Sequence, residues 1–129
     1  MKPKKFSLRS RFGSFKFAFE GLQFLLKNEH NSRIHLLAAI AVIILGIIVK
    51  LNHIEWSIMV IVIGLVFLVE LLNSSIETLA DLINPEWNEP IKRAKDYGAA
   101  AVLISAIIAM IAGVLIFIPK LLALIHHIA

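Results

Sequence analysis

The sequence of 129 residues contains no cysteine. This absence excludes disulfide bonds, thiolate nucleophiles, and metal or iron–sulfur sites built on cysteine. Three nucleotide-binding patterns are also missing, namely G-x-x-x-x-G-K-[ST], G-x-G-x-x-G and H-R-D. The chain therefore has neither a P-loop fold nor a protein-kinase fold.

Charged residues are scarce, at 17% of the chain, whereas 59% of the residues are hydrophobic and the mean hydropathy is +0.85. A domain this short has too much surface to hide so many apolar side chains from water. We therefore expect an integral membrane protein with a single domain over residues 1–129. The net charge of +4 lies mostly beside apolar segments, which favours anionic headgroups or phosphates over nucleic acid as partners. No small-residue cleavage pattern follows the basic start, so we expect no removable signal peptide.

The hydropathy pattern predicts an all-α architecture with three transmembrane helices. Apolar runs predict helices that contain the spans at about residues 30–50, 56–83 and 91–118, the last one ending before Pro119. The preceding segment, about 8–28, places aromatic residues at helical spacing but interleaves charges. It is predicted to be an amphipathic helix in the membrane interface.

Basic residues predict the orientation of the spans. Eight Lys and Arg residues precede the first span, only Lys50 lies between the first and second, and only Lys120 follows the third. Lys92, Arg93 and Lys95 lie between the second and third spans. The positive-inside rule therefore places the N-terminus and this second loop in the cytoplasm.

Acidic and amide side chains form a stripe at the end of the second span. Glu70, Asn73, Glu77 and Asp81 follow the spacing i, i+3, i+7 and i+11, which is that of one helical face. Ionisable residues in membrane segments are costly and are functional candidates by default. The stripe is therefore expected to face a protein-lined cleft.

Two further clusters lie near the same cytoplasmic boundary: Glu29 with Arg33, and Lys95 with Asp96. The carboxylates of Glu29 and Glu77 are suited to bind Mg²⁺ together with substrate phosphates. The ammonium group of Lys95 is suited to neutralise the charge of those phosphates. Glu70 lies deeper and suits a general base. The combination indicates phosphoryl transfer from ATP to a lipid hydroxyl. From spacing alone, an ion or proton pathway and a purely structural membrane subunit remain alternatives.

The histidines are not expected to form a site. His35 lies at the start of the first span, shortly after Arg33, and we expect it to serve helix packing.

The chain resembles the prokaryotic diacylglycerol kinase family, which includes the undecaprenol kinases of Gram-positive bacteria. The resemblance rests on "ELLNSSIETLAD" followed by "AKDYGAAAVL", together with "KNEHNSRIH" and "FKFAFEGL". It covers the chain from about Phe15 to Pro119.

The resemblance implies a multi-pass protein of the bacterial cytoplasmic (inner) membrane, assembled as a homotrimer with active sites between subunits on the cytoplasmic side. It implies that Glu70 is the catalytic base and that Mg²⁺ is bound by Glu29 and Glu77. It further implies a supporting role for Asn73 in the polar network and for Asp81 at the helix end. The ATP contacts that it implies are these: Glu29, Glu77, Glu86, Trp87, Asn88, Lys95 and Asp96.

Two positions depart from the diacylglycerol kinases. Phe17 stands where those enzymes often have a tyrosine that contacts the nucleotide, and Ala99 stands where they carry a serine. Arg33 and Ala99 are the remaining candidate site residues. Each is expected either to contact the lipid substrate or to support the residues that contact it. The segments "HIEW" and "LIFIPKLL" look more like the undecaprenol kinases, which favours a polyprenol acceptor, with diacylglycerol as the alternative.

Overall fold

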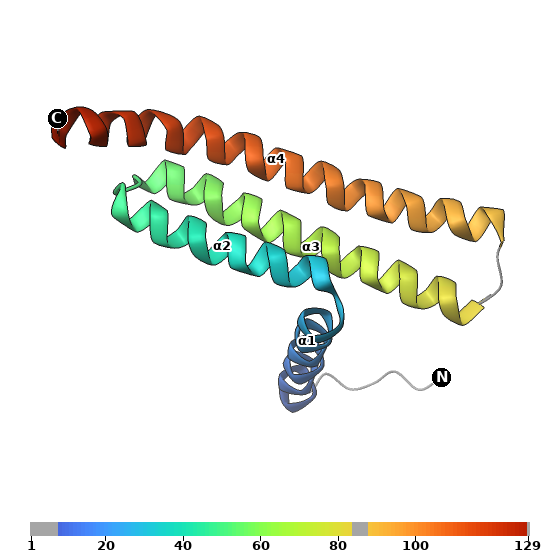
Figure 1. Cartoon of the computed structure of the whole chain (residues 1–129). Coiled ribbons are helices and arrows are strands. Elements are labelled where there is room, and N and C mark those ends of the chain that lie inside the picture. The colour runs from blue at the N-terminus through green and yellow to red at the C-terminus, as the bar shows by residue number, and fades with distance from the viewer. Residues whose placement is uncertain (1–7, 84–87, 129) are drawn as a thin grey trace.

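The computed structural model describes residues 8–83 and 88–128. These residues form four α-helices: α1 (Leu8–Asn28), α2 (His30–Ile48), α3 (His53–Ile83) and α4 (Glu89–Ile128). The three long helices α2, α3 and α4 lie lengthwise beside one another with alternating direction, and α1 projects from the side of this bundle (Figure 1). Most contacts between helices join α3 to α4.

Three of the helices, α2, α3 and most of α4, are long and apolar enough to cross a membrane. Large hydrophobic side chains are exposed along all three, among them Ile44, Leu68 and Leu115. Lipid is the environment that covers such surfaces without cost. The predicted all-α architecture is confirmed, with three helices that have the length and apolar character of membrane spans. The interfacial position of α1 stays a prediction.

The turn after α2 has a specific hydrogen-bonding pattern. The backbone N–H of Leu51 donates to Gly46 O at 3.0 Å, and that of Lys50 donates to Ile47 O at 3.2 Å. Lys50 adopts φ 54°, in the left-handed region. These bonds form a Schellman motif, which ends a helix by satisfying its last carbonyls. The helix therefore ends at Ile48, two residues before the predicted boundary.

The helix α3 begins earlier than predicted, at His53 rather than at Trp56. Asn52 Oδ1 accepts hydrogen bonds from the N–H groups of Ile54 and Glu55. In return, Glu55 Oε2 accepts the Asn52 N–H at 2.7 Å. This reciprocal pair is a capping box, which satisfies the unpaired donors of a helix start and sets the boundary at Asn52.

The prediction that the last helix ends before Pro119 is wrong, because α4 continues through this proline to Ile128. Proline removes one helical hydrogen bond and usually kinks or ends a helix. Here the turns on both sides are anchored to other helices. Phe117 and Leu121 pack with Leu51 and Met59, and Lys120 Nζ forms a 2.9 Å ion pair with Glu55. Tertiary packing therefore overrides the local signal.

Candidate functional site

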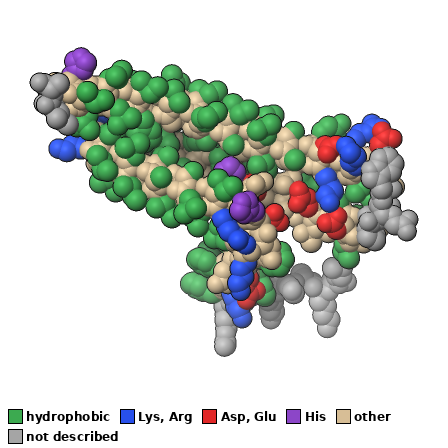
Figure 2. All heavy atoms as spheres, in the orientation of Figure 1, with side chains coloured by type: hydrophobic (Ala, Val, Ile, Leu, Met, Phe, Trp, Pro, Cys, Tyr) green, Lys and Arg blue, Asp and Glu red, His purple; other side chains and the backbone are tan. Residues whose placement is uncertain are grey.

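Many charged side chains are gathered at one end of the molecule. On the face shown in Figure 2, acidic and basic groups surround the end where α3 leads to α4, with more on α1. Hydrophobic side chains cover most of the rest of that face. Of the predicted site residues, Asp81 at the end of α3 and Lys95 near the start of α4 lie together at this end.

Glu70 is the buried carboxylate of this region, with only 3% of its surface exposed. It lies on α3 and faces α2. Its Oε2 accepts a hydrogen bond from Ser32 Oγ at 3.3 Å, and its Oε1 lies 3.2 Å from His35 Nε2. That second contact lacks the alignment of a hydrogen bond, so Oε1 has no hydrogen-bond donor among the described residues. The predicted inward-facing carboxylate is confirmed, and one of its oxygens remains available as an acceptor.

The two side chains that contact Glu70 come from one face of α2, because Ser32 and His35 are three residues apart. Ser32 is completely buried, and the His35 side chain is 22% exposed. His35 was expected to serve helix packing, and its ring does pack against α3, where the residue that it contacts is the candidate base. The i, i+3 spacing of Ser32 and His35 indicates in the sequence that they share one helical face. Nothing in the sequence related that face to Glu70.

A second polar group joins α3 to α4. Asn73 Nδ2 donates a hydrogen bond to Glu77 Oε1 at 3.1 Å. The other amide atom, Oδ1, is buried and has no donor among the described side and main chains. It lies against Gly98, where an added Cβ would overlap Oδ1 and come within 3.2 Å of Asn73 Cγ. Gly98 is therefore required for the close approach of α4 to this amide.

Glu29 lies at the junction of α1 and α2, in the position directly before α2. Its side chain does not cap the helix and has no ion-pair or hydrogen-bond partner within the described parts of the chain. Glu29 and Arg33, which lie four residues apart in the sequence cluster, do not form an ion pair with each other. Arg33 instead donates from Nε to Leu26 O at 2.9 Å and from its terminal nitrogen to Lys27 O. Arg33 thus ties the end of α1 to α2 and leaves the Glu29 carboxylate unpaired.

The basic residues at the start of α4 are already paired. Lys95 Nζ lies 2.9 Å from Asp81 Oδ1 on α3, and Lys92 Nζ lies 2.7 Å from Asp96 Oδ2 within α4. Lys95 and Asp96, which the sequence placed together, therefore belong to two different ion pairs. Both pairs are largely exposed, so solvent screening keeps them weak and exchangeable.

The remaining candidates are placed as follows. Asn88 precedes α4 and has a buried Oδ1 without a donor among the described residues. Phe17 is exposed on α1, and Ala99 is exposed on α4 beside the buried Gly98. Glu86 and Trp87 lie outside the described residues.

The carboxylates do not build a closed metal centre. Within residues 8–83 and 88–128, no three His, Asp or Glu side chains are grouped to hold a metal ion. Mg²⁺, however, commonly binds through one or two carboxylates and takes its other ligands from phosphates and water. Glu29, without a partner, and Glu77, which accepts one amide hydrogen bond, fit that kind of donor set.

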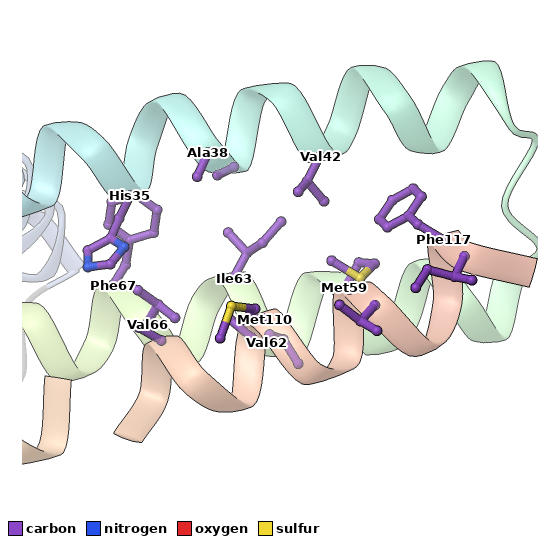
Figure 3. A pocket seen from close by; sticks show the side chains of 16 residues that line it. His35, Ala38, Val42, Met59, Val62, Ile63, Val66, Phe67, Met110 and Phe117 are labelled. Carbon is purple, nitrogen blue, oxygen red and sulfur yellow. The ribbon is translucent and has the colours of Figure 1, made fainter. Parts of the chain in front are cut away.

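An apolar cavity of about 420 Å³ lies between α2, α3 and α4. His35 lies at one end of it and Phe117 near the other (Figure 3). Its other lining residues are apolar, among them Val62, Phe67 and Met110. The cavity therefore runs along the membrane-spanning part of the bundle and reaches the residue that contacts Glu70.

Comparison with known proteins gives a consistent result. Residues 16–117 match the family described as prokaryotic diacylglycerol kinase. The chain is 44% identical to an undecaprenol kinase of Bacillus subtilis over 110 residues, which cover 85% of this chain and 89% of that protein. It is 36% identical to a diacylglycerol kinase of Synechocystis over 112 residues, or 86% of this chain and 64% of that protein. It is 35% identical to a diacylglycerol kinase of Escherichia coli over 95 residues, or 74% of this chain and 78% of that protein.

Proposed function

The chain belongs to the prokaryotic diacylglycerol kinase family and is a lipid kinase, and we propose that it transfers the γ-phosphoryl group of ATP to a lipid hydroxyl with Glu70 as general base. The observation that carries this proposal is the environment of Glu70. A buried carboxylate with one oxygen held by Ser32 and the other without a donor is oriented to accept a proton. Within an apolar bundle, the substrate that brings a hydroxyl to this depth is a lipid.

The residues around Glu70 divide the remaining tasks. Glu29 and Glu77 would hold Mg²⁺, which when bound neutralises charge on the ATP phosphates. Asn73 holds the Glu77 carboxylate through its 3.1 Å hydrogen bond. Lys95 would exchange its Asp81 partner for a phosphate oxygen, and Asp96 and the segment 86–88 would contact the nucleotide. Glu70 Oε1 would take the proton of the lipid hydroxyl as that oxygen attacks the γ-phosphorus.

A polyprenol such as undecaprenol is the proposed acceptor. The 44% identity to an undecaprenol kinase exceeds the 36% and 35% found with two diacylglycerol kinases. Ala99 lacks the hydroxyl that the diacylglycerol kinase pattern carries at this position, which supports the same choice. Diacylglycerol is the competing acceptor in the test below.

The proposed assembly is a homotrimer in the bacterial cytoplasmic membrane, with the N-terminus and the site on the cytoplasmic side. Two observations support this proposal. Large hydrophobic side chains are exposed on all three long helices, which leaves surface for neighbouring subunits as well as for lipid. The basic residues Lys92, Arg93 and Lys95 lie at the same end of the bundle as the site, where the positive-inside rule predicts the cytoplasm.

The experiment uses the purified full-length protein in detergent with radiolabelled ATP, Mg²⁺, and either undecaprenol or diacylglycerol. We expect label in the lipid, more efficiently with undecaprenol as judged by kcat/KM. Loss of a general base lowers turnover by about 10²–10⁴-fold, so Glu70→Gln should lower kcat by that amount. Glu20→Gln, which changes an exposed carboxylate on α1, is the matched control and should retain wild-type turnover. Wild-type kcat in Glu70→Gln would remove Glu70 from the base role, and an unlabelled lipid would overturn the proposed reaction.

A further inference from the structure

A buried base must release each proton that it accepts before it can act again. The Glu70 side chain is only 4% exposed, and Oε1 is among the buried atoms. Direct exchange with bulk water is therefore blocked by the surrounding helices. The proton has to leave through a neighbouring side chain or along a path that opens during turnover.

Two polar neighbours of Glu70 are seen among the described residues. Ser32 is completely buried and binds the opposite carboxylate oxygen, Oε2. His35 lies 3.2 Å from Oε1, the oxygen proposed to receive the lipid proton. The His35 ring is 22% exposed and lies at the end of the apolar cavity (Figure 3). Of the two neighbours, His35 is therefore the one that both contacts Oε1 and is partly exposed, five residues after the start of α2 at His30.

We propose that His35 is the proton exit of Glu70. The inference rests on the proposed base role of Glu70. When the lipid oxygen bonds to the γ-phosphorus and the bond to the leaving ADP oxygen breaks, the lipid O–H proton passes to Glu70 Oε1. A turn of the His35 ring that aligns Nε2 with Oε1, from which it lies 3.2 Å away, then lets the proton pass to Nε2 of neutral His35, whose own proton is on Nδ1. The resulting imidazolium releases the Nδ1 proton to water, which returns both residues to their starting state.

A relay has a kinetic signature that differs from that of a structural contact. The first phosphoryl transfer needs only an ionised Glu70, whereas every later turnover needs the proton to leave. Glutamine keeps a polar side chain of similar reach but does not titrate. In His35→Gln we therefore expect rapid labelling of about one lipid per active site, followed by a steady state at least about tenfold slower than wild type, within the range of proton-transfer effects. The KM for Mg·ATP should stay within twofold of wild type.

The experiment is a rapid-quench time course of lipid labelling, with the radiolabelled ATP and the undecaprenol of the activity test. His35→Gln, Glu70→Gln and wild type are compared at equal concentrations of active protein. His53→Gln serves as the matched control, because His53 is exposed at the other end of the bundle, and it should behave as wild type. Thermal unfolding in the same detergent verifies that His35→Gln is folded.

The outcomes separate the two proposals. A burst followed by slow turnover in His35→Gln, with neither phase in Glu70→Gln, supports the relay. Wild-type steady-state turnover in His35→Gln overturns the relay but leaves Glu70 as the base. Equal slowing of the first and later turnovers also overturns the relay, because it shows that His35 only holds the carboxylate in place. Wild-type kinetics in Glu70→Gln would instead overturn the proposed function.

Discussion

The side-chain amide of Asn73 on α3 lies directly against the backbone of Gly98 on α4, with no room for a Cβ between them. The same amide donates to Glu77 at 3.1 Å. The packing of two helices is thereby coupled to the position of a proposed metal ligand. Helix contact and carboxylate placement therefore meet in one side chain.

Replacement of Gly98 by alanine is therefore expected to displace Asn73 and, with it, Glu77. Inserting a methyl group into a tight contact costs about 1–3 kcal/mol, so the thermal midpoint in detergent should fall. The Mg²⁺ concentration needed for half-maximal activity should rise. Gly64→Ala is the matched control, since nothing lies within 4 Å of a Cβ added there. An unchanged Mg²⁺ titration in Gly98→Ala would show that Asn73 does not position a metal ligand.

Ser32→Ala removes the hydroxyl that holds Glu70 Oε2 in the buried space between α2 and α3. A hydrogen bond to a charged group contributes about 1.5–3 kcal/mol, and every 1.4 kcal/mol corresponds to about a tenfold effect. We expect kcat to fall by about tenfold or more with little change in the KM for Mg·ATP, as measured by steady-state labelling of the lipid. Ser57→Ala removes an exposed hydroxyl at the other end of α3 and should leave kcat unchanged. If the two variants behave alike, Ser32 has no part in orienting the base.

Asp81→Asn removes the carboxylate that pairs with Lys95. Without this partner, the ammonium group of Lys95 can bind phosphate without first breaking an ion pair. The KM for Mg·ATP should therefore decrease. Because the pair is exposed, the thermal midpoint should change little. Lys95→Ala should act in the opposite direction and raise the same KM. A higher KM in Asp81→Asn would instead show that Asp81 holds Lys95 in the orientation that ATP needs.

Lys50→Gly tests the turn between α2 and α3. Lys50 has φ 54°, a conformation that costs roughly 1–2 kcal/mol for a residue with a Cβ. Glycine should therefore raise the free energy of unfolding by about 1 kcal/mol without changing kinase activity, because the turn lies at the end of the bundle away from Glu70. Denaturant titration in detergent measures the first quantity and lipid labelling the second. A destabilised variant would mean that the Lys50 side chain contributes more than its backbone strain costs.

The amino-acid sequence by itself determined the class of protein, the three apolar spans and the helical stripe from Glu70 to Asp81. These features follow from local periodicity, in which each residue's position on a helix depends only on its neighbours along the chain. The same locality explains the errors at helix ends. The capping box at Asn52 was readable from the spacing of Asn52 and Glu55, but the passage of α4 through Pro119 depends on contacts with α3 and the α2–α3 turn.

Only the tertiary structure decided which side chains meet. Glu70 contacts Ser32 and His35, which lie 38 and 35 positions earlier in the chain, and Lys95 pairs with Asp81 rather than with the adjacent Asp96. Such pairs depend on how each helix is rotated about its axis and shifted along its neighbour. Rotation by one residue, about 100°, would bring a different side chain to the same place. Interlocking side chains such as Asn73 and Gly98 select one rotation and one shift, and that selection turns separate helical faces into a site.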